Sequence, residues 1–172
     1  LPELLIRLGV RKLGFEKDFL IWGIYQQLYR NLKKLNHPIR LIPLKSLVDE
    51  MREVKDGAEI KAMEASAALM SEILEEVIEG LEPGRTEREI AWQIKGLAHE
   101  AGAEALAFPP IVASGPNSAL PHAVPTERKI RAKEPIILDV GLKIDGYCCD
   151  MTRTVFLGSP GPKFRKIYRT VR

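Results

Sequence analysis

Long hydrophobic runs, disulfide-forming cysteine patterns and low-complexity segments are all missing from this sequence of 172 residues. No apolar run approaches the roughly 18 residues that a membrane span needs, and no signal-peptide pattern opens the chain. The two cysteines, Cys148 and Cys149, are adjacent, and adjacent cysteines do not readily bridge each other with unstrained geometry. These absences predict a protein without a membrane segment in a reducing compartment, which is typical of the cytoplasm.

Nucleic-acid-binding motifs are missing as well, although the chain is basic at its amino-terminal end. The net charge is +3; residues 1–48 hold nine basic against three acidic side chains, and residues 49–172 hold 17 against 20. The basic residues of the first segment are dispersed rather than clustered: Arg7, Arg11, Lys12, Lys17, Arg30, Lys33, Lys34, Arg40 and Lys45. Because a recognisable motif normally accompanies a nucleic-acid-binding patch, we interpret this segment as a solvated basic face and expect no nucleic-acid partner.

The first 45 residues have the pattern of a strand, a helix and a strand. Residues 11–14 lead into a helical stretch over residues 18–35, where apolar side chains recur at three- and four-residue steps. His37 and Pro38 break this pattern, and residues 39–44 favour a short strand. A piece of this size is too short to bury a core alone.

Two amphipathic helices and then a series of strands are expected after this piece. One long apolar stripe predicts a helix over residues 57–79. Thr86, with Glu89 three residues later, forms a capping box that begins the next helix, and Gly102 ends it. From Phe108 onward the period changes to two, and we expect strands as far as Lys163. Helices followed by a sheet predict an α+β fold.

Two aspartates fall on one face of a predicted hairpin. Asp145 and Gly146 form a strong two-residue turn signal, because a type I′ turn needs positive φ at both positions. If the hairpin closes there, Asp139 faces Thr152, and Asp150 is a diagonal neighbour of Asp139 on the same face. Diagonal neighbours lie roughly 7–8 Å apart at the backbone, which lets their carboxylates reach a common pair of metals.

The opposite face of the hairpin is apolar and is expected to be buried. It comprises Ile136, Leu138, Val140 and Leu142 on one strand and Cys149, Met151, Arg153 and Val155 on the other. Arg153 is expected to reach the rim of the sheet or to pair with an acid, since a lone buried charge is costly. Cys148 is interpreted as a small packing residue. A half-exposed sheet with two solvent-facing aspartates is the alternative to a metal site.

Three runs resemble motifs of the prolidase, aminopeptidase P and creatinase group of metallopeptidases. Residues 137–158, ILDVGLKIDGYCCDMTRTVFLG, are similar to one signature, and residues 111–130, IVASGPNSALPHAVPTERKI, are similar to another. Residues 47–66, LVDEMREVKDGAEIKAMEAS, resemble the junction between the two domains of that group. The resemblance implies a pita-bread fold, with residues 49–172 as the first half of the catalytic domain. Residues 1–48 would be the C-terminal piece of the amino-terminal domain.

The resemblance also implies roles for five residues. Asp139 and Asp150 match the first two of five metal ligands, and Asp150 matches the ligand that bridges both metals. His122 matches a histidine that contacts the substrate and stabilises or relays charge at the scissile amide. Thr152 matches a position close behind the metals, and Thr154 one that supports the ligands. The implied cofactors are two divalent ions, Mn or Co, with Fe and Zn as alternatives. The implied substrate is a short peptide with an Xaa-Pro bond.

Two positions depart from the pattern of the group. Ala123 stands where a glycine usually follows the motif histidine, and Pro109 and Pro110 stand in place of a polar pair. Both departures leave the substrate preference open without touching the matched metal ligands. His37 and His99 match nothing catalytic.

The resemblance places the remaining ligands, a histidine and two glutamates, in a second half that follows a helix beginning near Lys163. Because the chain ends at Arg172, we expect a fragment or a truncated relative that alone lacks appreciable Xaa-Pro dipeptidase activity. An unpartnered half-domain should also self-associate, with a two-fold dimer as the simplest form.

Several rival functions stay open beside an Xaa-Pro dipeptidase. Aminopeptidase P and creatinase belong to the same group, whereas residues 1–45 argue against a methionine aminopeptidase. A non-catalytic pita-bread binding protein is the alternative outside the enzymes. Such relatives tend to lose the aspartates and the histidine, and this sequence keeps Asp139, Asp150 and His122.

Overall fold

A computed structural model describes residues 2–34 and 38–171. The predictions for Leu35 and His37 therefore lie outside the described residues. The chain divides into two compact units, Leu1–Lys55 and Asp56–Arg172, and each unit is described by itself. The domain assignment from the sequence, with its boundary after residue 48, stays a prediction.

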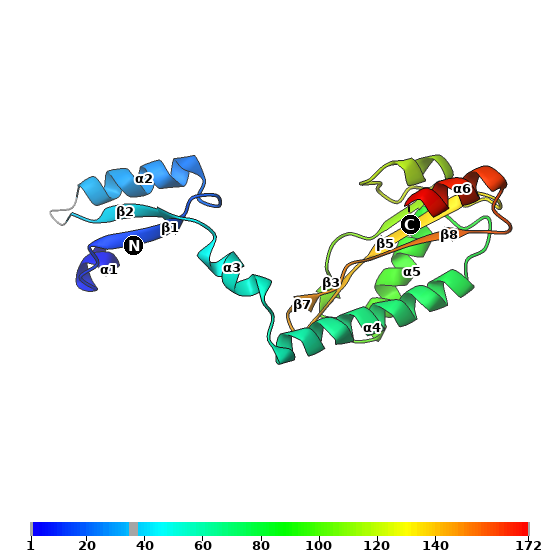
Figure 1. The fold of residues 1–172 in the computed structure, drawn as a ribbon, viewed down its shortest axis with the longest axis horizontal. Coiled ribbons are helices and arrows are strands. Elements are labelled where there is room, and N and C mark those ends of the chain that lie inside the picture. The colour runs from blue at the N-terminus through cyan, green and yellow to red at the C-terminus, as the bar shows by residue number, and fades with distance from the viewer. Residues whose placement is uncertain (1, 35–37, 172) are drawn as a thin grey trace. The chain divides into compact units, whose positions relative to one another are not determined.

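The first unit holds a parallel pair of strands connected through a helix. Its elements are α1 (Pro2–Arg7), β1 (Lys12–Glu16), α2 (Trp22–Lys33), β2 (Arg40–Leu44) and α3 (Leu47–Glu53), and Figure 1 shows α2 running alongside the pair β1–β2. Helix α2 begins four residues later than Asp18, where we expected it, because Phe19 and Leu20 donate backbone hydrogen bonds to Glu16 in a turn. The short helices α1 and α3 had no clear sequence signal.

The second unit has two long helices followed by two small sheets, which confirms the α+β prediction. Its elements are α4 (Gly57–Glu79), α5 (Glu87–Glu100), β3 (Ala105–Leu106), β4 (Ile111–Ser114), the 3-10 helix η1 (Gly115–Ala119), β5 (Pro135–Val140), β6 (Leu142–Ile144), β7 (Tyr147–Cys148), β8 (Met151–Phe156) and α6 (Pro162–Val171). The strand orders are β4-β5-β8 and β3-β6-β7. No helix in the described part of the chain has the length and apolar character that crossing a membrane requires.

Both long helices begin at capping boxes. The Asp56 carboxylate accepts hydrogen bonds from the first-turn amides of α4, and Glu59 accepts from the Asp56 amide in return. Thr86 and Glu89 form the predicted reciprocal pair at α5. Each box satisfies backbone N–H groups that have no partner inside the helix. The box at Asp56 was missed from the sequence.

The core lies between the two helices and the sheets (Figure 1). Its buried members include Met70, Ile73, Leu74 and Val77 from α4, Ile90 and Ile94 from α5, Val112, Ile136, Leu138, Val140 and Leu142 from the strands, and Ile130 from the loop before β5. Of the eight positions expected on the apolar face of the hairpin, the four on the first strand, Ile136, Leu138, Val140 and Leu142, are fully buried. On the second strand Cys149, Met151 and Val155 are only half-buried and Arg153 is exposed. Burial of the alternate residues of β5 leaves Asp139 on the other face of this strand.

The expected series of strands is interrupted, and the prediction is wrong over residues 115–134. All of these residues are described, and they form η1 and a long irregular loop. Pro116, Pro121 and Pro125 fall within the segment. Proline has no backbone N–H to contribute to a ladder, which explains why the strand pattern fails here.

Candidate functional site

The hairpin forms in the predicted register. Asp145 and Gly146 adopt φ values of 48° and 82°, as a type I′ turn requires. Strands β5 and β8 pair antiparallel with Asp139 opposite Thr152, and Lys143 opposes Cys148 beyond the break between the sheets. The two aspartates of the hairpin therefore lie where the turn signal placed them.

Gly141 separates the two sheets along this hairpin. A Cβ atom there would collide with the carbonyl oxygen of Cys149 and would lie 3.0 Å from both Ala107 and Phe108. The ladder stops at Val140 and resumes where the Cys149 amide donates to the Leu142 carbonyl at 2.9 Å. Gly141 and Asp150 would face each other in the register set by the turn, but they do not form a ladder pair.

One open pocket collects the residues singled out from the sequence. It has a volume of about 410 Å³ and is lined by Phe108, Pro109, Ile111, His122, Ala123, Val124, Asp139 and Asp150. Asp139 is half-buried, whereas His122 and Asp150 are exposed. The structure thereby brings together the imidazole of the loop after η1, one carboxylate from β5 and a second carboxylate from the residue just before β8.

The two threonines of β8 differ in their contacts. The Thr152 hydroxyl donates a hydrogen bond of 2.7 Å to the Asp139 carboxylate, which holds that carboxylate in one orientation. Thr154 is exposed and lies opposite Ile137. Within the described residues neither Asp139 nor Asp150 forms an ion pair. Two carboxylates without a cationic neighbour in one pocket are a natural place for a metal cation.

Residues 61–172 match the model of metallopeptidase family M24. The chain belongs to this family. It is 33% identical over 165 residues to an Xaa-Pro dipeptidase of Pyrococcus horikoshii, and the alignment covers 95% of this chain and 45% of that protein. The chain therefore spans about half the length of the curated relatives that it matches.

Solved structures of M24 enzymes share the fold over nearly the whole chain. The Xaa-Pro dipeptidase from Bacillus anthracis is 34% identical with a TM-score of 0.88, covering 99% of this chain and 46% of that structure. The X-Pro aminopeptidase from Thermotoga maritima is 26% identical with a TM-score of 0.82, covering 99% and 47%. The α+β architecture described above is thus part of the pita-bread fold of M24 peptidases.

The donor set of this M24 chain fits part of a metal site. M24 peptidases are metallopeptidases by family, and carboxylate oxygens suit hard divalent cations. Within the described residues no group of three or more His, Cys, Asp and Glu side chains is arranged to hold a metal. Asp139 and Asp150 could supply two ligands, which are fewer than a complete coordination shell.

The structure also shows where two other hairpin residues with predicted positions lie, Arg153 and Cys148. Arg153 is exposed at the rim, where its guanidinium donates to the Thr152 carbonyl at 3.0 Å. Cys148 is exposed, so its interpretation as a packing residue is wrong. Its neighbour Cys149 is the one that packs, because its sulfur accepts from the Leu142 amide and donates to the Ser66 carbonyl.

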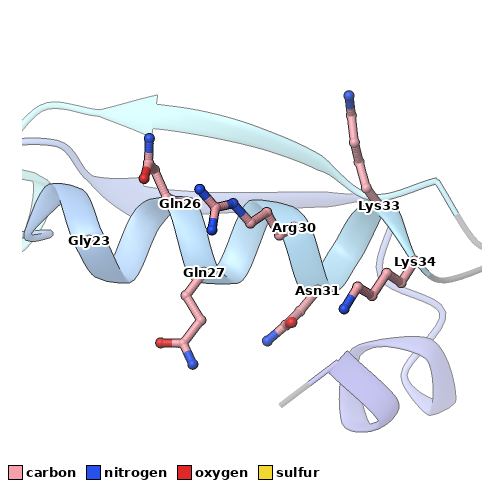
Figure 2. Close-up of a pocket in the computed structure, with 7 residues that line it drawn as sticks. All are labelled: Gly23, Gln26, Gln27, Arg30, Asn31, Lys33 and Lys34. Carbon is pink, nitrogen blue, oxygen red and sulfur yellow. The ribbon is translucent and has the colours of Figure 1, made fainter.

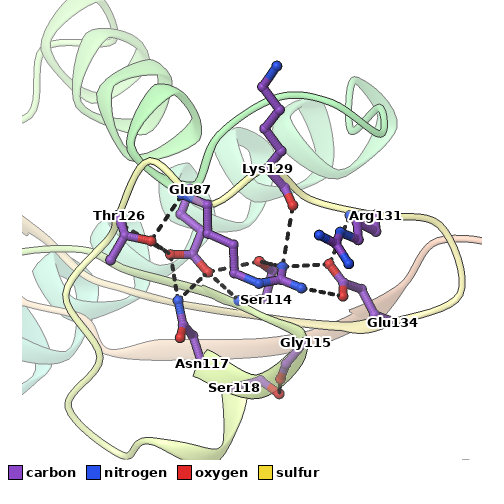
Figure 3. A network of polar contacts seen from close by, with 10 residues as sticks. Glu87, Ser114, Gly115, Asn117, Ser118, Thr126, Lys129, Arg131 and Glu134 are labelled. Carbon is purple, nitrogen blue, oxygen red and sulfur yellow. Dashed lines mark hydrogen bonds and ion pairs between the residues drawn. The ribbon is translucent and has the colours of Figure 1, made fainter.

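A buried carboxylate beside the pocket loop was missed from the sequence. Glu87, in the first turn of α5, is fully buried, and Figure 3 shows its carboxylate among donors from Ser114, Asn117 and Thr126. Burial raises the pKa of Glu87, but hydrogen bonds from Thr126 and Ser114 outweigh it, so this pKa lies below its ordinary value. A glutamate in the first turn of a helix is a common sequence feature. No sequence pattern connects Glu87 with its distant hydrogen-bond partners, so its burial could not be predicted.

A second hollow lies on the first unit and has a different character. Figure 2 shows polar and basic side chains projecting from α2, and the open space that they line has a volume of about 590 Å³. Its lining residues are Gly23, Gln26, Gln27, Arg30, Asn31, Lys33 and Lys34, all from one helix and its end. No carboxylate and no second described element contribute to it, so the chemistry of an M24 peptidase does not fit there.

Proposed function

We propose that this chain supplies one part of the catalytic site of an Xaa-Pro dipeptidase. The observation that carries the proposal is the single pocket that joins His122, Asp139 and Asp150. The relatives named Xaa-Pro dipeptidase, from Pyrococcus horikoshii and Bacillus anthracis, support this substrate class. A short peptide with proline in its second position is the proposed substrate.

Two divalent cations, Mn or Co with Fe and Zn as alternatives, are the proposed cofactors. Asp139 and Asp150 would hold them, with Asp150 contributing to both, and the further ligands would come from outside the described residues. When bound, such a pair activates a water and polarises the scissile carbonyl. Thr152 keeps the Asp139 carboxylate oriented through its hydrogen bond, and Thr154 is proposed to support the same strand.

His122 and the apolar side chains of the pocket have separate proposed roles. His122 lies exposed on the pocket loop, where its imidazole stabilises or relays charge at the scissile amide. Phe108, Ile111 and Val124 provide an apolar wall in the same pocket. An apolar wall suits the ring of a proline, which carries no side-chain polar group to be satisfied.

Aminopeptidase P activity is a second candidate, favoured by the likeness to the X-Pro aminopeptidase of Thermotoga maritima. The two activities share the Xaa-Pro bond and differ in the length of peptide that follows it. A cytoplasmic location and a homodimer are further parts of the proposal, and both rest on the sequence.

Hydrolysis assays test the proposal with a protein that carries this chain together with a complete ligand set. We expect metal-dependent cleavage of Leu-Pro with Mn or Co, no cleavage of Leu-Ala, and inhibition by a chelator. Faster cleavage of Leu-Pro-Ala than of Leu-Pro would favour the aminopeptidase. Absence of metal-dependent cleavage of both proline peptides would overturn the proposed function.

A further inference from the structure

The loop that carries His122 is attached at both ends to one carboxylate. Before His122 in sequence, the Ser114 amide and hydroxyl each donate to Glu87 Oε1 at 2.8 Å, and the Asn117 amide group donates to both oxygens at 3.0 Å. After His122, the Thr126 amide and hydroxyl donate to Oε2 at 3.1 and 2.6 Å. Figure 3 shows these donors converging on the carboxylate from two segments of the chain.

Between these attachments the loop packs through the buried Ala123 but has little other hydrogen-bonded support. From Pro121 to Pro125 the described chain makes no hydrogen bond. The turn before it is closed by the Leu120 amide, which donates to the Asn117 carbonyl at 3.0 Å, and by the Ser118 hydroxyl, which donates to the Gly115 carbonyl at 2.6 Å. The position of His122 in the pocket therefore depends on how its two flanks are held.

Backbone bonds hold the later flank against the start of α5 as well. The Glu87 and Arg88 amides donate to the carbonyls of Arg128 and Thr126, both at 3.1 Å. Arg128 also donates to the Ser114 hydroxyl and forms a two-pronged ion pair with Glu134 at 2.6 and 2.7 Å. Arg128 thus also connects the two flanks, through Ser114 before His122 and Glu134 after it. The Glu87 carboxylate is the group that accepts hydrogen bonds from both flanks, from Ser114 and Asn117 before His122 and from Thr126 after it.

We infer that Glu87 is a positioning residue that fixes the loop carrying His122. This role in catalysis rests on the proposed function, whereas the attachment itself does not. The carboxylate is the required group because every partner is an N–H or O–H donor, and ionised Glu87 is acceptor-only. In Glu87→Gln the side-chain NH₂ would face donors, which leaves several buried polar groups unsatisfied.

Hydrogen exchange on the 172-residue chain, without metal or substrate, tests the attachment. In Glu87→Gln, the amides of Ser114 and Thr126, which donate to this carboxylate, should exchange at least about tenfold faster, since one hydrogen bond to a charged group is worth that factor or more. Amides of α4 should keep their rates. Glu89→Gln is the matched control: it removes a carboxylate from the same helical turn that bonds only Thr86, and it should leave the loop unchanged.

A second readout follows the histidine itself. With ¹³C-labelled histidine, assigned through His122→Ala, the His122 ring signal should move toward that of a free peptide in Glu87→Gln, while the His99 signal stays. Unchanged loop exchange and an unchanged His122 signal would overturn the inference, as would equal acceleration across the whole second unit.

Should Glu87→Gln fail to fold, Asn117→Ala decides the question. This variant removes only the two contacts of one loop side chain with Glu87. Faster exchange confined to residues 115–122 supports the inference, and wild-type exchange there contradicts it. All of these outcomes are independent of peptidase activity, so a failure of the proposed function would be seen separately.

Discussion

Asp150 and His122 line the same pocket, yet their replacement should have different consequences. In an active protein that contains this chain, Asp150→Ala removes a ligand proposed to serve both metals, so metal content and turnover should both collapse. His122→Ala should keep the metals and lose about a hundred- to a thousandfold in kcat, as for one donor at the transition state. Metal analysis and kcat for both variants check this. Equal residual rates with unchanged metal content would contradict it.

Ionisation of Glu87 should stabilise the fold in a defined pH range. Because its pKa in the folded state is lowered from 4.5, the contribution is present above that value and is lost as pH falls through the folded pKa. Urea unfolding of wild type and Glu87→Gln between pH 7 and pH 3 measures it. The wild-type advantage in free energy of unfolding should narrow as the pH drops below 4.5. A constant difference across this range would argue against an ionised Glu87.

At the scale of elements, Gly141 separates the strands that carry the site from those near the turn. Gly141→Ala should destabilise the second unit by roughly 1–3 kcal/mol, because the added methyl overpacks a filled space. Gly96→Ala is the control of opposite sign: no neighbour lies within 4 Å of the added Cβ, and the gain in helix propensity is up to about 1 kcal/mol. Denaturant midpoints of both variants check the pair. A neutral Gly141→Ala would contradict the close packing.

Elements with strong local signals were predictable from the sequence. The turn at Asp145 and Gly146, the alternating strand β5 and the capping box at Thr86 each depend on neighbours within a few residues. These signals were sufficient to place Asp139 and Asp150 on one face. That His122 reaches the same pocket followed from the resemblance alone, because no periodicity connects a loop to a distant hairpin.

Features that depend on long-range contacts were not predictable. The irregular segment 115–134 is held partly by Glu87, and its partners lie 27 to 39 residues away. The break at Gly141 requires a backbone oxygen, Ala107 and Phe108 from three other positions. The pattern of a single sequence contains no information on contacts between residues far apart in the chain. Strands were therefore expected over residues 115–134, where the chain forms a loop.

At the scale of the whole molecule, the chain has two units and spans about half the length of its M24 relatives. Its described residues supply two adjacent carboxylates and no larger ligand group. Metal binding by this chain should therefore be weak and local, because a partial coordination shell holds a cation loosely. A method that detects weak, localised binding is needed to locate the site.

Paramagnetic broadening of amide NMR signals by added Mn²⁺ tests the central claim most directly. We expect the signals of Asp139, Asp150 and Thr152 to broaden first, and Asp150→Asn to abolish this selectivity. Asp145, an exposed carboxylate at the turn of the same hairpin, is the internal control and should broaden later. Broadening that begins at Asp145 or elsewhere, or that is unaffected by Asp150→Asn, would contradict a metal site at the aspartate pair.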